Sequence, residues 1–388
     1  MSFPMHHATI PLPALRAPFR TFFLALAASL FLLAPLVPDR ACATTPSTAS
    51  DAAASMTQDE LDQAISDDPR NAALYIARSQ RHMTNRSFPR AIVDLDQALR
   101  LAPNDPTALK LRGEAYARMG NWARSTADYE QAVRLAPENE PALFGLARAR
   151  LESGDLNRAL EDLSRLLRTS PNHLEGRLYR GRLYLERDNH QQALADFDVA
   201  ATLAPESAEA LFGRGKSLRE LGRLDAALAD LTRTIRLEPT APAYMERGLT
   251  SGAQGDLRSA LDDFNAALRL APGDALAHFH RASLYALAAD HQRAVADFTQ
   301  TLRQEPDHLQ ALLGRGLAYQ ELEQFTQAID DYTRVIRLDP NNYGALNNRG
   351  MVFLQLGHLT QGCDDLRTAC ALGRCTTLDF ARKEGYCP

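Results

Sequence analysis

An aspartate recurs through most of this chain at a nearly constant interval, and regularly spaced carboxylates are residues that could carry chemistry. Paired carboxylates act as general acids and bases. The aspartates are Asp94, Asp128, Asp162, Asp196, Asp230, Asp263, Asp297, Asp331 and Asp365. All but one of them follow an arginine by sixteen residues, and these arginines are Arg78, Arg112, Arg180, Arg214, Arg247, Arg281, Arg315 and Arg349.

The fixed offset between arginine and aspartate favours ion pairing over catalysis. If both residues lie in an antiparallel helical hairpin that turns midway between them, their side chains are level with each other. We therefore predict an Arg–Asp pair that bridges the two helices of each hairpin and fixes their register. Nine recurring catalytic carboxylates are the alternative.

Cysteines are the second group of residues that could carry chemistry. Four of the five lie in the last 26 residues, at Cys363, Cys370, Cys375 and Cys387. In an oxidising compartment an even number indicates disulfides. A tail helix over 377–386, antiparallel to the helix before it, puts Cys387 level with Cys363 and leaves Cys370 to close on Cys375. A zinc site and a redox role remain alternatives, although the sequence has no C-x-x-C pair.

Other signatures of catalysis or of metal binding are weak. His278 and His280 are two residues apart, so on a helix their side chains point roughly 200° away from each other. The sequence contains no G-x-x-x-x-G-K-[ST], H-E-x-x-H or G-x-S-x-G motif. We predict no enzyme activity, no metal site and no cofactor.

Prolines show which elements must position these residues. Pro69, Pro103, Pro137, Pro171, Pro205 and Pro239 are 34 residues apart, and Pro272, Pro306 and Pro340 continue the series after a single step of 33. Numbering each repeat so that this proline is position 32 gives nine units, from Ala72–Asp105 to Tyr343–Thr376. The paired arginine and aspartate then occupy positions 7 and 23.

Other positions of the unit are also restricted in residue type. Position 8 is usually glycine, as in Gly181, and positions 20 and 27 are small, as in Ala193 and Ala200. Positions 11 and 24 are often aromatic, as in Tyr184 and Phe197. This succession resembles the tetratricopeptide repeat family, whose 34-residue unit is a helix-turn-helix. One departure is the third unit, which has Arg150 at position 11.

The resemblance implies an all-α, right-handed superhelical solenoid of about nine helix-turn-helix units with helical caps at both ends. One hairpin cannot bury its own apolar face, so neighbouring units must stack and share a core. We expect a signal peptide at 1–43, a flexible leader at 44–56, an amino-terminal capping helix at 57–71, nine units at 72–374 and a disulfide-clipped capping helix at 375–388. Thr57 and Glu60 have the form of a capping box.

In this family positions 2, 5, 9, 12 and 13 point into the concave groove, so the resemblance implies which residues bind a partner. The residues at position 5 form a mostly apolar row that includes one lysine. Position 9 is a cation in three consecutive units. The apolar row marks either a groove or surface covered by neighbours, and the cations form either a basic patch for an acidic group or a mixed solvated face. The candidates are Ile76, Lys110, Phe144, Arg148, Leu178, Arg182, Phe212, Lys216, Met245, Phe279 and Leu313, and Arg219 lies nearby.

The amino terminus resembles an export signal. Arg16 and Arg20 precede an apolar run over 22–37, and Ala41-Cys42-Ala43 follows. The run is shorter than the roughly 20 residues of a spanning helix. We expect cleavage after Ala43 and a periplasmic protein; a membrane anchor through uncleaved residues 22–37 is the alternative.

The functional expectation is a scaffold that binds other proteins in its groove and performs no chemistry. The formal net charge of −5 argues against nucleic acid as a partner. A structural or assembly subunit of a cell-envelope complex, which would use the convex face and the ends, is the alternative.

Overall fold

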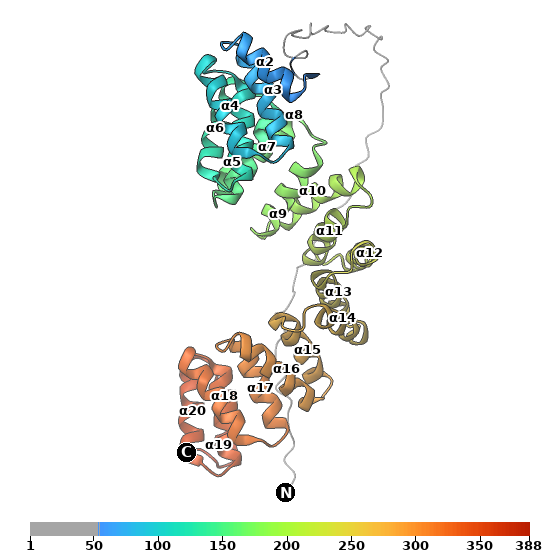
Figure 1. Cartoon of the computed structure of the whole chain (residues 1–388). Coiled ribbons are helices and arrows are strands. Elements are labelled where there is room, and N and C mark those ends of the chain that lie inside the picture. The colour runs from blue at the N-terminus through green and yellow to red at the C-terminus, as the bar shows by residue number, and fades with distance from the viewer. Residues whose placement is uncertain (1–52, 54) are drawn as a thin grey trace, which may run out of the picture. The chain divides into compact units, whose positions relative to one another are not determined.

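The computed structural model describes residues 53 and 55–388, and within them the chain is helical with no β-strand (Figure 1). This confirms the predicted all-α solenoid. The expected signal peptide and most of the expected leader lie outside the described residues. The helices are α2 (Gln58–Asp67), α3 (Ala72–Thr84), α4 (Phe88–Leu101), α5 (Pro106–Arg118), α6 (Trp122–Leu135), α7 (Glu140–Glu152), α8 (Leu156–Thr169), α9 (Leu174–Leu185), α10 (His190–Leu203), α11 (Ala208–Glu220), α12 (Leu224–Leu237), α13 (Ala241–Gln254), α14 (Leu257–Leu270), α15 (Ala275–Leu287), α16 (His291–Gln304), α17 (Leu309–Glu321), α18 (Phe325–Leu338), α19 (Tyr343–Gln355), α20 (Leu359–Ala371) and α21 (Thr376–Lys383).

Polar caps and prolines set the ends of these helices. The capping box at α2 is confirmed, since the Thr57 hydroxyl accepts from the backbone N–H of Glu60 and the Glu60 carboxylate accepts from that of Thr57. Asp105 caps α5 in a related way, by accepting from the N–H groups of Thr107 and Ala108. The repeated proline follows each second helix from α4 to α18 by two residues, because it cannot donate to the helical ladder.

The helices pack in the order of the chain. The two helices of each unit pack against each other, and each second helix packs against the first helix of the next unit. Most successive first helices also approach one another, as α9 and α11 do, although α7 and α9, and α13 and α15, do so less closely; no two second helices make a comparable contact. We call the surface formed by the first helices α3, α5, α7, α9, α11, α13, α15, α17 and α19 the inner face.

The aromatic ring at position 24 shows how units share one core. Phe197 on α10 is fully buried, together with the small residues Ala193 and Ala200 of the same helix. A methyl group at Gly181, on α9 of the same unit, would lie 2.9 Å from this ring, and a methyl group at Gly213, on α11 of the next unit, would overlap it. The ring therefore fills space that two successive units leave open.

All eight predicted Arg–Asp pairs form. In each, Nε and Nη2 of the arginine donate to the two carboxylate oxygens at 2.6 to 2.9 Å, and the aspartate is buried. This parallel geometry is the strongest form of arginine–carboxylate contact. The hydrogen bonds that Arg247 donates to the carboxylate of Asp263 raise the pKa of Arg247 above its ordinary value.

The third unit makes its pair from a different position. Leu146 stands where the other units have arginine, and Arg150, one helical turn later, donates through Nη1 to Asp162 at 2.5 Å. Its Nη2 donates to Glu130 of the preceding unit at 2.7 Å. The departure from the family pattern at position 11 is thus a relocated arginine.

The arginines also connect neighbouring units, which the sequence analysis did not predict. In each of the eight, Nη1 donates at 2.7 to 3.4 Å to a side chain at position 25 of the unit or cap before it, sixteen residues earlier in seven cases and fifteen for Arg247. Each guanidinium therefore holds three helices. The acceptors are Asp62, Asp96, Ser164, Asp198, Thr232, Asn265, Thr299 and Thr333.

The carboxy-terminal helix α21 covers the last unit. Two disulfides hold it, Cys363–Cys387 and Cys370–Cys375, with Cα–Cα distances of 5.6 and 4.0 Å. This is the pairing favoured by the sequence. Leu378 and Cys387 pack in a small core with Leu366 of α20, so α21 supplies the apolar surface that a further unit would supply.

Among helices of the described residues, none is both long and apolar enough to span a membrane.

Asp263→Ala should destabilise the chain by about 3 to 5 kcal/mol, because the partly buried guanidinium of Arg247 loses its carboxylate. The double variant Asp263→Ala/Arg247→Ala should recover part of that loss. Denaturant unfolding of the two single variants and the double variant measures the coupling. Strictly additive losses would contradict a paired role.

Peptide mapping without reduction should find the peptides of Cys363 and Cys387 linked to each other, and likewise those of Cys370 and Cys375. A link between Cys363 and Cys370, or four free thiols, would contradict this connectivity.

Candidate functional site

The position 5 residues are less accessible than an open apolar groove requires. Leu178 and Met245 are only 8% and 6% exposed and pack in the hydrophobic core. The prediction that Leu178 and Met245 bind a partner is therefore wrong, because both belong to the core. The other candidates of this row are half-buried, namely Ile76, Lys110, Phe144, Phe212, Phe279 and Leu313.

An aromatic and cationic cluster occupies the inner face at α7 and α9. The ring centroid of Phe144 lies 4.8 Å from that of His173 and 5.7 Å from that of Tyr179. Arg148 lies over Phe144 and Arg182 over Tyr179, at 5.8 and 4.3 Å from the ring centroids. These contacts orient the two candidate cations. His173 and Tyr179 could not be recognised from the sequence, because His173 is the amino-terminal cap of α9 and Tyr179 is at position 6, which is not one of the groove positions.

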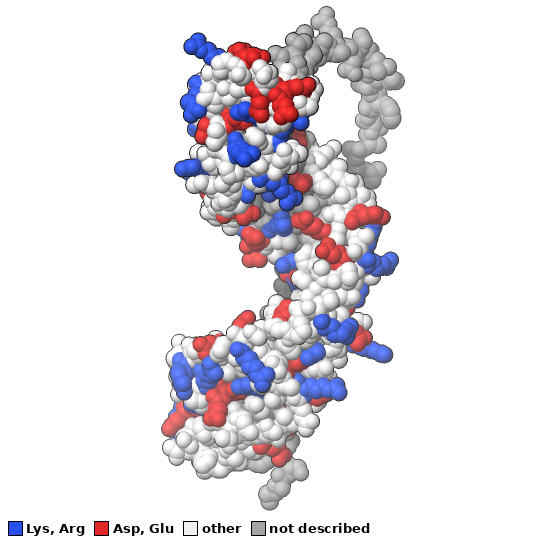
Figure 2. All heavy atoms as spheres, in the orientation of Figure 1, with Lys and Arg blue, Asp and Glu red and all other residues white. Residues whose placement is uncertain are grey.

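Acidic residues neutralise much of the predicted basic patch. Arg182 pairs with Glu209 of the next unit at 3.4 Å. Lys216 and Arg219 both approach Glu246, at 3.7 and 3.0 Å. Figure 2 likewise shows acidic and basic side chains interspersed over the visible face. These contacts favour the mixed face over a continuous basic patch.

Two candidate cations differ from this pattern. Arg148 is exposed and Lys110 half-buried, and neither forms an ion pair with any residue that the structure describes. They occupy the inner face of consecutive units, on α7 and α5. An acidic group of a partner could therefore approach them without displacing an intramolecular pair.

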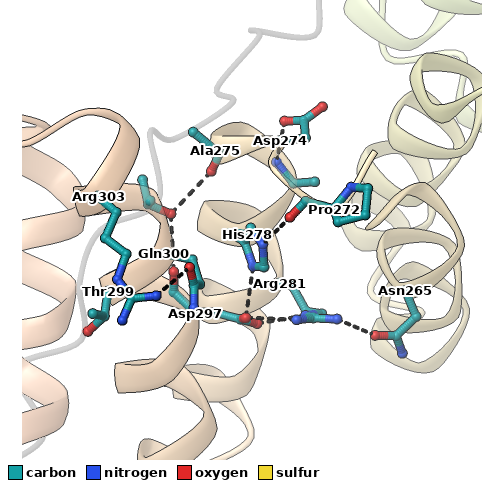
Figure 3. A network of polar contacts seen from close by, with 12 residues as sticks. Asn265, Pro272, Asp274, Ala275, His278, Arg281, Asp297, Thr299, Gln300 and Arg303 are labelled. Atoms are coloured by element: carbon teal, nitrogen blue, oxygen red, sulfur yellow. Dashed lines mark hydrogen bonds and ion pairs between the residues drawn. The ribbon is translucent and has the colours of Figure 1, made fainter. Parts of the chain in front are cut away.

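His278 is engaged in a structural network (Figure 3). Its Nδ1 lies 2.9 Å from Oδ1 of Asp297, and its Nε2 lies 3.0 Å from the carbonyl oxygen of Pro272. Arg177 occupies the same position three units earlier and donates to Asp196 and to the carbonyl of Pro171. His278 thus takes the place of a structural arginine.

His280 lies against aromatic rings. Its ring is stacked on Phe264, with centroids 5.8 Å apart and an interplanar angle of 19°. Burial, with a smaller contribution from the charge of Arg219, lowers the pKa of His280 to about 4. The two histidines thus serve packing and hydrogen bonding within units six and seven.

Family models described as tetratricopeptide repeat match residues 78–152, 144–208, 180–242, 245–308, 288–322 and 309–342. The chain belongs to the tetratricopeptide repeat family. This fold is that of a scaffold for protein–protein interaction. No curated protein matches the chain.

The chain is similar to several solved structures. YrrB, described as a tetratricopeptide repeat protein with an unusual peptide-binding site, is 22% identical with a TM-score of 0.44, over 51% of this chain and 100% of its own. A tetratricopeptide repeat protein from Parabacteroides merdae is 19% identical with a TM-score of 0.49, over 64% and 98%. The Cut9–Hcn1 hetero-tetramer of the APC/C is 14% identical with a TM-score of 0.47, over 87% and 94%.

The lowered pKa of His280 predicts a specific loss of stability in acid. The unfolded chain takes up this proton near pH 6.5, whereas the folded chain resists it down to about pH 4. The contribution of the neutral ring to the free energy of unfolding is therefore complete above pH 6.5, and it falls by about 3 kcal/mol as the pH drops to 4. His280→Gln should lose less stability than the parent over this interval. If the free energies of unfolding of the two proteins changed equally with pH, the lowered pKa of His280 would be contradicted.

Proposed function

We propose that this protein is a non-catalytic scaffold whose inner face binds a segment or helix of a partner protein. The observation that carries the proposal is the cluster around Phe144, where half-buried aromatic rings lie beside Arg148, a cation without an ion pair in the described residues. An apolar side chain of a partner would contact the rings, and an acidic side chain would neutralise Arg148.

Lys110 supports the same reading. It lies one unit before Arg148 on the inner face and is also without an ion pair in the described part of the chain. A bound segment that runs across units two to four would pass both cations. Arg182 of unit four is already paired with Glu209, and Lys216 and Arg219 of unit five with Glu246, so these cations contribute orientation more than affinity.

We further propose that the protein works outside the cytoplasm, in the periplasm of a bacterium. The arginines and apolar run that precede Ala43 support this compartment. The two disulfides also support it, since such bonds persist in oxidising environments. Retention in a membrane through residues 22–37 is the competing arrangement, and the molecular mass of the protein isolated from its source cells distinguishes the two.

Phe144→Ala/Phe212→Ala should weaken partner binding about tenfold or more, because both rings belong to the inner face. Partners are captured by crosslinking in an envelope extract, identified, purified and titrated against each variant. Val93→Asp, at an exposed position of the second helix α4, is the control and should leave the dissociation constant unchanged. Loss of binding by the control alone would favour assembly through the outer face.

A further inference from the structure

The inner face changes chemical character between units five and six. In units three, four and five, positions 2, 5, 9, 12 and 13 include both cations and carboxylates, such as Arg182 and Glu186. In units six and seven the same ten positions carry no charge. They are Pro242, Met245, Leu249, Gly252, Ala253, Leu276, Phe279, Ser283, Ala286 and Leu287.

Two leucines of this uncharged region are open to solvent. Leu276 is 52% exposed and Leu287 is 63% exposed. Both belong to α15 and are eleven residues apart, which is close to three full turns, so they share one face about 16 Å apart along the helix. Phe279 and Ser283 lie between them on that face, and Phe279 is half-buried beside His308, at 4.8 Å between ring centroids.

Residues around this face do not cover it. Met245 on α13 is buried, in one core cluster with Ala277 of α15. Leu313 and Leu317 of α17 are half-buried and extend the apolar surface into unit eight. Exposed apolar surface that continues over adjacent elements is typical of an interaction site.

We propose that the inner face of α13 and α15 is a second contact region, which docks an uncharged, leucine-bearing segment of the partner protein. This inference rests on the proposed function and specifies the chemistry of the partner. A charged side chain placed here would lose its water without gaining a counter-charge, whereas burial of Leu276 and Leu287 favours an apolar one. The length of the face fits about three turns of helix or about five residues of extended chain.

The two regions together predict a partner with two unlike parts. One part is uncharged and contacts units six and seven, and the other carries an acidic side chain toward Arg148. Because both regions belong to first helices of the same solenoid, a single segment or two linked segments could contact both, and linkage would raise the overall affinity.

The test uses the full chain with its disulfides intact and a set of fluorescent 14-residue peptides. The peptides are built from Leu, Ala, Ser and Gln, with leucines at helical or alternating spacing, and matched sets carry Asp or Lys beside the leucines. The variant is Leu276→Asp/Leu287→Asp. The matched control is Leu270→Asp/Val93→Asp, because those residues are 54% and 66% exposed but belong to the second helices α14 and α4. Circular dichroism verifies that both variants stay helical.

At least one uncharged peptide should bind the parent and the control equally, and should bind Leu276→Asp/Leu287→Asp at least tenfold more weakly. The charged peptides should bind the parent at least tenfold more weakly than their uncharged counterparts. Equal binding to both variants, a preference for charged peptides, or no binding within the set would overturn the inference. So would a dimer in sedimentation that only Leu276→Asp/Leu287→Asp dissociates, because a second copy would then cover the face.

Failure here is distinguishable from failure of the proposed function. If the captured partner loses affinity for Phe144→Ala/Phe212→Ala but binds Leu276→Asp/Leu287→Asp normally, the scaffold function stands and the second region is wrong.

Discussion

Each helical hairpin of this chain depends on its neighbours for a place to bury its apolar surface. The position 24 ring makes this dependence concrete, because Phe197 fills space left by Gly181 in its own unit and by Gly213 in the next. The arginine ladder adds directionality. A guanidinium has five donors in a planar fork, and here the fork joins both helices of one unit to the second helix of the unit before.

This architecture explains which charges are free for recognition. The arginines at position 7 and the aspartates at position 23 are already engaged in the ion pairs that join the helices. Arg150 forms such pairs from another position. On the inner face, neighbouring units pair their charges as well, as Arg182 and Glu209 do. What remains for a partner on the described inner face is a small set: Arg148 beside aromatic rings, Lys110, and an uncharged leucine surface. Specificity for a partner would then come from these few places, because most other charged side chains described for the inner face are paired within the chain.

Much of the fold was predictable because one unit is repeated, so each residue type is sampled many times in the same environment. The Arg–Asp pairs followed from a constant offset. The hydrogen bond to position 25 of the preceding unit was not predicted, because the acceptor there varies among Asp, Ser, Thr and Asn, although it is always polar. The burial of Leu178 and Met245, and the exposure of Leu276 and Leu287, depend on the size of side chains in adjacent units, which a single unit's pattern does not report.

The most direct test of the shared core is hydrogen exchange on the full chain carrying Phe197→Ala. If units depend on one another for burial, amide protection should fall in α9 to α12, on both sides of the altered ring, while α17 to α20 keep theirs. Loss confined to α10, or uniform loss along the whole chain, would contradict a stack of interdependent hairpins.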